Sequence, residues 1–251
     1  MTDEPVKKIN PVRAVTPEAV KLAKTLIHSA KFGALAVTDT MTGRPGISRV
    51  AVATDTTGAP ITLVSSLSAH TKALAHNPYC AILLGEPAKG DPLAHPRISL
   101  SCYAAFLDRD TPETDQIAAR YLRCNPKSKL YASFADFHYV RLTPISASLN
   151  AGFGRAYNLD TAHVLSPPFS QDGNLDDQEI MRRLNGPQNE TVAAMASIET
   201  GKTVLKCVVL NFDSEGLDLL LGGHFRRIWF PAPLATKGDL FAFMMKYGKM
   251  V

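Results

Sequence analysis

The stretch from Ser48 to Pro78 constrains the fold more than any other part of the chain: SRVAVATDTTGAPITLVSSLSAHTKALAHNP. An alternating strand that carries Arg49 is followed by a glycine-containing turn, a second strand and a short helix. Strands joined by so short a turn pair antiparallel. We therefore expect an antiparallel sheet, and the chain shows no strand–helix–strand rhythm of the kind that builds parallel sheets.

The remainder of residues 1–165 continues this pattern. Thr16-Pro17 and Thr111-Pro112 each read as a helix N-cap followed by proline at the first helical position. Further helical segments are expected after residue 69 and over 127–134, and the loop 85–96 is too rich in Gly and Pro to be regular. Strands are expected over 34–38, 47–54, 60–65, 79–84, 97–107, 137–142 and 146–149. About six strands with short helices predict a small antiparallel barrel with helical decorations.

The segment 166–174, SPPFSQDGN, has the composition of a linker. Beyond it we expect helices over about 176–184 and 190–198, then strands over 204–212, 217–221 and 225–230, and a last helix over 238–247. Three hairpin-linked strands packed by helices predict a small α+β domain. The sequence thus predicts an α+β protein with a barrel domain (1–165), a linker (166–174) and a C-terminal domain (175–251).

The 251 residues include 27 basic and 23 acidic side chains, and the basic ones are spread along the chain. This distribution gives no support to nucleic-acid binding or to a membrane surface. No run approaches the ~20 apolar residues of a spanning helix, and the start lacks an apolar signal core. The four cysteines are far apart, as in reduced structural thiols. We expect a cytoplasmic protein.

The end of the second strand and the start of the next helix bring hydroxyl and basic residues together. Ser65 and Ser66 end the strand, Thr71 and Lys72 open the helix, and Arg49 lies in the preceding strand. Hydroxyls, cations and a helix N-terminus together favour a phosphate site. Each residue also has a simpler interpretation: a solvated arginine, a serine cap, or a solvated lysine.

The other polar motifs are weaker. The GFGR motif at 152–155 lacks the spacing of a dinucleotide-binding loop, and a tight turn that closes the barrel is the favoured interpretation. The seven histidines are scattered without metal-ligand spacing, so no metal site is expected. No G-x-S-x-G motif is present, and the catalytic residues remain unknown.

Four blocks in order resemble a known family: SRVAVATD, LVSSLSAHTKALAHNPYCAILLG, GDPLAHPRISL and LNAGFGRAYNL. They are similar to the haem-utilisation branch of the pyridoxamine-5'-phosphate-oxidase-like FMN-binding split barrels. The segment LDLLLGGHFRRIWFPAPL resembles the small domain of unknown function that often follows this barrel.

The resemblance implies a homodimer with FMN at the subunit interface and no nucleic-acid or membrane partner. Gly154 and Arg155 would approach the flavin from one subunit or the other. The cofactor-binding residues implied by the resemblance are Ser48, Arg49, Val50, Ser65, Ser66, His70, Thr71, Lys72, Gly154 and Arg155.

One departure concerns haem. Relatives open the C-terminal domain with a histidine-rich helix, whereas this chain reads RRLNGPQNET over residues 182–191, without histidines between Leu184 and Thr191. His163 and His224 remain conceivable axial ligands. The leading hypothesis is an FMN-binding oxidoreductase of unknown substrate. The alternatives are a haem-binding or haem-degrading protein and a non-catalytic flavin-binding or regulatory module.

Overall fold

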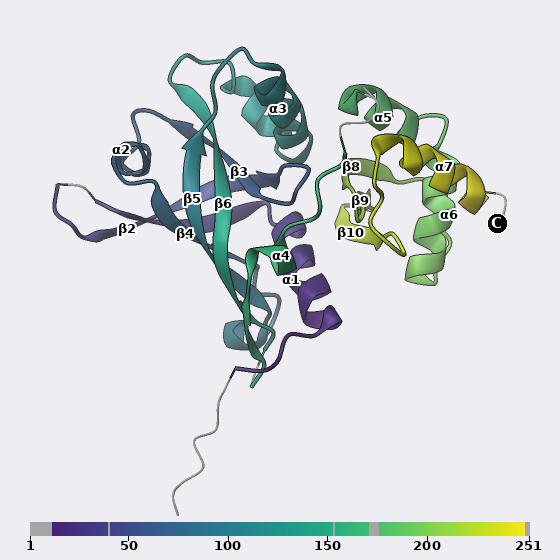
Figure 1. Cartoon of the computed structure of the whole chain (residues 1–251), viewed down its shortest axis with the longest axis horizontal. Helices are drawn as coiled ribbons and strands as arrows, with labels where there is room; N and C mark the ends of the chain where they lie inside the picture. The colour runs from purple at the N-terminus through teal and green to yellow at the C-terminus, as the bar shows by residue number, and fades with distance from the viewer. Residues whose placement is uncertain (1–11, 40, 153, 171–175, 249–251) are drawn as a thin grey trace, which may run out of the picture.

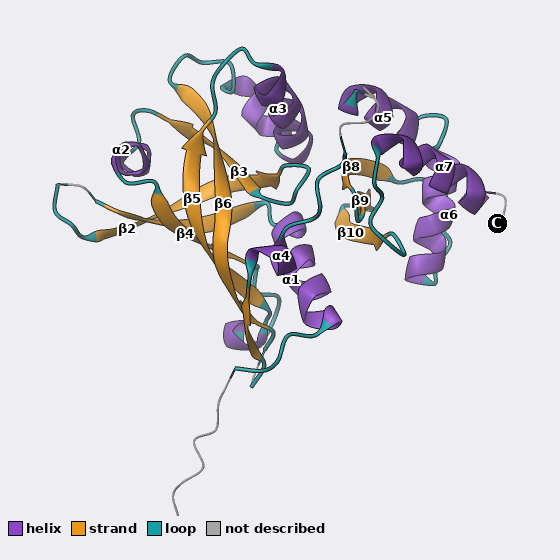
Figure 2. Cartoon of the chain, viewed as in Figure 1, coloured by secondary structure: helices purple, strands orange, loops and turns teal. Residues whose placement is uncertain are grey.

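The computed structural model describes residues 12–39, 41–152, 154–170 and 176–248, which form two antiparallel sheets (Figures 1 and 2). The larger sheet has the strand order β3-β2-β1-β4-β5-β6-β7, and the smaller has the order β10-β9-β8. The strands of the larger sheet are β1 (Phe32–Thr38), β2 (Pro45–Thr54), β3 (Pro60–Ser65), β4 (Tyr79–Leu84), β5 (Arg97–Phe106), β6 (Phe137–Asn150) and β7 (Ala156–Leu159).

An additional pairing between β3 and β6 closes the larger sheet into a barrel. Residues 61–65 pair with residues 141–137 in antiparallel register, so that six strands form the barrel and β7 lies beside β6. Leucine, isoleucine and valine side chains from these strands fill the interior together with one face of the first helix. The predicted antiparallel barrel is confirmed.

Strand β6 differs from expectation, because it runs unbroken where two strands were predicted. Pro144 pairs with Cys102 while Ser146 pairs with Ser101, which leaves Ile145 as an extra residue in the ladder. Such a bulge accommodates a proline, since proline has no N–H to donate to the neighbouring strand. The two predicted strands are therefore joined by a bulge, and the long β6 spans the barrel.

The helices of this part are α1 (Pro17–Ser29), α2 (Ala69–His76), α3 (Pro112–Cys124) and α4 (Thr161–Val164). The two predicted caps are present: Thr16 Oγ1 accepts from Ala19 N, and Thr111 Oγ1 accepts from Thr114 N, each at 3.2 Å. The helix expected over 127–134 is only a short 3-10 helix, η2 (Pro126–Leu130), and the irregular loop 85–96 contains another, η1 (Pro92–Ala94).

The C-terminal part is built around the smaller sheet. Its elements are α5 (Asp177–Leu184), α6 (Asn189–Thr200), β8 (Val208–Asp213), β9 (Gly216–Leu221), β10 (His224–Trp229) and α7 (Lys237–Gly248). Strand β8 starts four residues later than expected. The part has its own buried cluster, with Leu184, Val192, Phe212 and Leu217 fully covered. On this basis we propose that a second domain follows the barrel at about residue 165.

The start of the predicted linker is packed rather than free. Ser166 is buried, its N–H donates to Thr57 O at 2.8 Å, and its hydroxyl donates to Glu215 Oε2 at 2.6 Å. Residues 171–174 of the predicted linker lie outside the described residues. The first part of this segment thus belongs to the contact between the two sheets.

A buried charge network, here called the clasp, joins the barrel to the smaller sheet. His28 Nδ1 of α1 lies 2.8 Å from Asp218 Oδ2, and Arg227 binds both Asp218 and Asp213 with contacts of 2.7 Å. These four side chains are at most 3% exposed. Because buried charges are stable only when they are paired, the network fixes the two sheets relative to each other.

Three more cations of the barrel belong to the clasp and reach the β8–β9 hairpin. Their contacts are Lys24 Nζ to Glu215 Oε2 at 2.6 Å, Arg120 Nη1 to Phe212 O at 3.0 Å, and Arg123 Nε to Leu210 O at 2.8 Å. Arg120 also donates to two carbonyls at the end of β2, so one side chain ties both sheets together.

All four cysteines are free thiols, in agreement with the expected reduced state. Burial raises the pKa of the Cys80 thiol to about 11 and that of the Cys124 thiol likewise to about 11, which keeps both protonated near neutral pH. Within the described ranges, no helix combines the length and the apolar character that crossing a bilayer requires.

Candidate functional site

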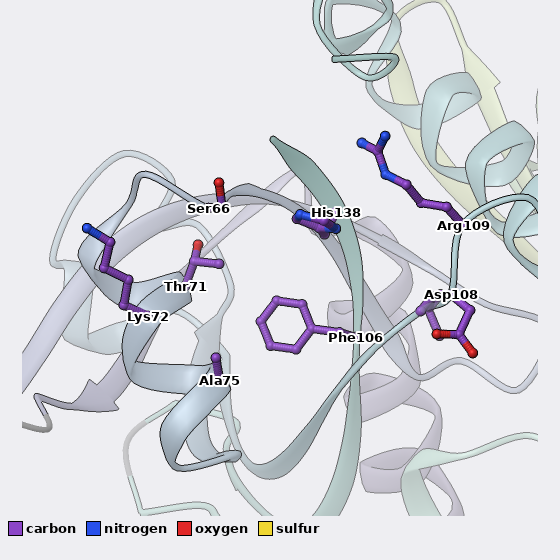
Figure 3. Close-up of a pocket in the computed structure, with 9 residues that line it drawn as sticks. Ser66, Thr71, Lys72, Ala75, Phe106, Asp108, Arg109 and His138 are labelled. Atoms are coloured by element: carbon purple, nitrogen blue, oxygen red, sulfur yellow. The ribbon is translucent and has the colours of Figure 1, made fainter. Parts of the chain in front are cut away.

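A cavity of about 540 Å³ opens between α2 and the adjoining ends of β5 and β6 (Figure 3). We call it the α2 pocket. Its lining comes from three regions that are distant in sequence, and barrel closure brings them together: Ser66, Thr71, Lys72, Ala75, Phe106, Leu107, Asp108, Arg109 and His138.

Three of the predicted residues line this pocket. Thr71 lies in the first turn of α2 and is 5% exposed, yet its hydroxyl has no hydrogen-bond partner among the described residues. Ser66 and Lys72 are exposed beside it. A buried hydroxyl without a partner costs about 1–3 kcal/mol. The α2 pocket therefore holds a donor that an anionic oxygen would satisfy, next to a lysine.

Ser65, by contrast, has a structural contact. Its hydroxyl donates to Asp136 Oδ2 at 2.6 Å, and the N–H of Ser66 donates to Asp136 O at 2.7 Å. Ser65 Oγ also accepts from Leu67 N. The two serines thus connect the end of β3 to the segment before β6, which places Ser66 at the pocket edge.

Ser48, Val50 and His70 lie where α2 packs on β2. Ser48 Oγ is 3.1 Å from His70 Nδ1, and Val50 is in the barrel core. Burial lowers the pKa of the His70 imidazole. Because the Val50 side chain is buried in the barrel core, any contact between Val50 and a ligand would have to come from its backbone.

Arg49 lies on the outer face of the barrel, since side chains alternate along a strand and both neighbours point inward. Its guanidinium carbon is 5.1 Å from the centre of the Phe32 ring, and the residue is exposed. In the single chain Arg49 is therefore a solvent-exposed arginine on the outer face of the barrel. Within one chain, Arg49 does not line the α2 pocket with Lys72.

Gly154 and Arg155 follow the far end of β6, whereas His138 of the pocket is at its beginning. Gly154 has a φ of 68°, Ala151 N donates to Arg155 O, and Arg155 Nη2 donates to Ala151 O at 2.7 Å. These contacts form the tight turn between β6 and β7. The two residues are therefore remote from the α2 pocket of their own chain.

The sequence interpretation missed the opposite wall of the pocket. Phe106 and His138 pack edge to face at 6.3 Å between ring centres, and Figure 3 shows them between α2 and Arg109. Arg109 Nη2 donates to the carbonyls of Phe134 and Phe137. Both strand ends were expected, but the closure of β3 against β6, which places His138 opposite Val64 and so close to the start of α2, carries no local sequence signal.

The conceivable haem ligands lie elsewhere. His163 Nδ1 accepts from Asp160 N at 3.2 Å in α4, and His224 is exposed at the start of β10. In the departing segment, Asn185 and Asn189 donate to carbonyls of the β8 side, to Val209 O and Cys207 O at 3.0 Å each. This segment therefore supports the smaller sheet. Among the described residues, no group of three His, Cys, Asp or Glu side chains could hold a metal ion.

Comparison with known proteins agrees with this architecture. The model of the family described as CREG, beta-barrel matches residues 15–164, which is the barrel with α1 and α4. The chloroplastic heme oxygenase HOZ of Arabidopsis thaliana is 28% identical over 255 residues, covering 95% of this chain and 73% of that protein.

Two solved structures are similar over nearly the whole chain. The protein Atu2129 from Agrobacterium tumefaciens, of unknown function, superposes with a TM-score of 0.74 at 23% identity, covering 94% of this chain and 99% of its own. A heme binding protein from Mycobacterium smegmatis superposes with a TM-score of 0.56 at 26% identity, covering 94% and 98%. The chain belongs to the CREG β-barrel family, within the haem-utilisation branch of the pyridoxamine-phosphate-oxidase-like split barrels.

Proposed function

We propose that the protein is an FMN-binding split-barrel protein of the oxidoreductase class, with the flavin phosphate in the α2 pocket. The buried Thr71 hydroxyl without a partner carries the proposal. A phosphate oxygen would accept from this hydroxyl, while Lys72 would supply charge and Ser66 a second donor. When bound, FMN supplies the electron transfer, and the protein orients it and excludes water.

The outer face of the barrel supports a homodimer around the cofactor. Large apolar side chains are exposed on neighbouring strands: Phe32, Ile47, Tyr79, Leu83 and Tyr103. A face of this kind marks an interaction surface. Arg49 lies on it, so a second copy would bring Arg49 into a covered position. In such a dimer, the turn at Gly154 and Arg155 of one subunit would approach the flavin bound to the other subunit.

FMN binding is tested on the purified full chain by its visible spectrum and by fluorescence titration with FMN. We expect flavin fluorescence to be quenched on binding, and Lys72→Ala to weaken the affinity at least tenfold. Lys127→Ala is the matched control, because Lys127 is an exposed lysine outside the pocket lining. Absence of any FMN binding by the wild-type protein would refute the proposal.

The dimer is tested by sedimentation. Leu83→Lys places a charge on the outer face and is expected to give monomers with weakened FMN binding, whereas Leu205→Lys, at an 87% exposed site of the C-terminal part, leaves both unchanged. Arg49→Ala is expected to cost on the order of 2–5 kcal/mol of FMN binding in the dimer. FMN binding of undiminished strength in a Leu83→Lys monomer would exclude an interface site.

Haem binding or degradation is the second candidate function, favoured by the similarity to HOZ over 95% of the chain and by the heme binding protein of M. smegmatis. Haem propionates are also anionic oxygens that the Thr71 and Lys72 side chains could bind. Titration with haemin tests this candidate, because a Soret band that shifts on binding and is reversed by added FMN supports haem in the α2 pocket, whereas no Soret change excludes haem. If the protein binds a ligand but catalyses no reaction with it, the interpretation as a non-catalytic binding or regulatory module is the one that is left.

Cytoplasmic localisation stays a prediction.

A further inference from the structure

A second cavity, here called the α3 pocket, adjoins the α2 pocket and has a volume of about 500 Å³. The two cavities share Leu107, Arg109 and His138 in their linings. Figure 3 shows His138 and Arg109 on the side of the α2 pocket away from Lys72. The α3 pocket is therefore separated from the α2 pocket by little more than these side chains, and α3, η2 and the start of β6 form its other walls.

Tyr139 is a lining residue of the α3 pocket, and its buried hydroxyl lacks a hydrogen-bond partner among the described residues. The residue is 8% exposed, and its ring packs edge to face on Tyr121, with 5.5 Å between ring centres. The neighbouring Tyr131 hydroxyl, in contrast, is 2.9 Å from Ser128 Oγ. Burial raises the pKa of Tyr139 to about 12, so its phenol stays protonated and can donate.

The remainder of the lining limits the chemistry of a ligand. Ala118, Leu122 and Phe137 give the cavity apolar walls. Its charged lining is mixed, with Arg109 and Lys129 against Asp110 and Asp115. A mixed rim does not select a highly charged molecule such as a phosphate ester. Apolar walls with one buried donor suit a flat organic molecule that carries a single acceptor group.

We propose that the α3 pocket binds a small planar organic molecule through a carbonyl or carboxylate oxygen that accepts from the Tyr139 hydroxyl. That this molecule lies beside a bound cofactor rests on the proposed function. Its binding in the α3 pocket does not depend on that function. His138 lies between the two sites, so a ligand in the α3 pocket would contact the side chain that also borders the cofactor.

The probe is 2-naphthoate, a planar carboxylate, titrated calorimetrically into the full chain. Tyr139→Phe keeps the ring and removes only the hydroxyl, and we expect it to weaken 2-naphthoate binding at least fivefold while the melting temperature shows that the variant is folded. Ala118→Phe fills the cavity and is expected to abolish binding. Naphthalene, which lacks the acceptor, should bind the wild type and Tyr139→Phe equally.

The two proposals fail separately. Thr71→Val is expected to weaken FMN and leave 2-naphthoate unaffected, and Tyr139→Phe to do the reverse. Binding of 2-naphthoate that depends on Tyr139 in a protein that does not bind FMN refutes the proposed function and supports the α3 pocket. Failure of the wild type to bind 2-naphthoate, or equal affinity in Tyr139→Phe, overturns the α3 proposal.

Discussion

Two buried threonines, Thr71 and Thr62, allow an effect on ligand binding to be distinguished from an effect on stability. Thr71 and Thr62 each have a hydroxyl that is buried without a partner among the described residues, but Thr71 lines the α2 pocket whereas Thr62 lies inside the barrel, in β3. An unmade hydrogen bond is unfavourable in the free protein at both positions. Only at Thr71 does a cavity allow a ligand to satisfy it.

Thr71→Val is therefore expected to lower FMN affinity roughly tenfold or more, because a hydrogen bond to a charged oxygen contributes about 1.5–3 kcal/mol. The same change should raise the unfolding free energy of the ligand-free protein by about 1 kcal/mol, since it removes an unsatisfied hydroxyl. Fluorescence titration and urea unfolding measure the two effects. In Thr62→Val only the stability should rise. Equal FMN affinities in wild type and Thr71→Val would contradict the assignment.

Part of the candidate site could be predicted from the sequence alone. Ser66, Thr71 and Lys72 were found because a strand end followed by a helix start is visible locally. Phe106 and His138 were not, since the pairing of β6 with both β5 and β3 brings them to these residues, and β3 and β6 are separated by more than seventy residues. The direction in which Arg49 points follows from alternation along β2, and sequence alone left both directions open.

Elements were predicted well where a local signal sets their ends. Threonine caps followed by proline fix the starts of α1 and α3, and glycine-containing turns separate β1, β2 and β3. The long β6 was divided in the prediction because Pro144 resembles a strand end, whereas the bulge at Ile145 lets the strand continue. The tertiary context overrides the local signal at this point.

Strands β9 and β10 of the smaller sheet lie so close at Gly216 that no side chain fits there. A Cβ added at this position would overlap the carbonyl oxygen of Ile228 in β10, which is backbone and cannot easily move away. Gly216→Ala is therefore expected to lower the unfolding free energy by about 3 kcal/mol, at the upper end of overpacking effects. Chemical denaturation measures this. Gly238→Ala in α7, where a Cβ meets only an ordinary contact, is the control and should be neutral or slightly stabilising. Equal denaturation midpoints for the two variants would refute the argument.

The clasp determines how the whole molecule responds to acid. Burial alone would raise the pKa of Asp218, but the charges of His28 and Arg227 outweigh burial and lower it from 3.8 to about 2. A carboxylate with a lowered pKa stabilises the folded state above its unfolded pKa, and this stabilisation is lost as the pH falls through the folded value. Between about pH 4 and pH 2 the protein is expected to lose on the order of 2 kcal/mol through this group.

Asp218→Asn should be destabilised by roughly 3–5 kcal/mol at pH 7, because it leaves part of a buried charge network uncompensated. The difference from wild type should shrink as the pH falls from 4 to 2, where wild-type Asp218 takes up its proton. Urea unfolding over this range measures the effect, with Glu86→Gln, an exposed carboxylate, as the control. A difference that stays constant with pH would show that the ion pairs of Asp218 are not the cause.

The division of charge across the clasp also limits how this protein can be recombined with its relatives. The carboxylates of Asp213, Glu215 and Asp218 belong to the smaller sheet, whereas Lys24 and His28, which face them, belong to the barrel. A chimera that takes each part from a different parent keeps Arg227 with Asp213 and Asp218, but it retains the contacts to Lys24 and His28 only where the barrel parent has the same residues at these α1 positions. Exchange of the C-terminal half is therefore a coupled change in two distant segments, and a junction at the linker alone does not define an interchangeable module.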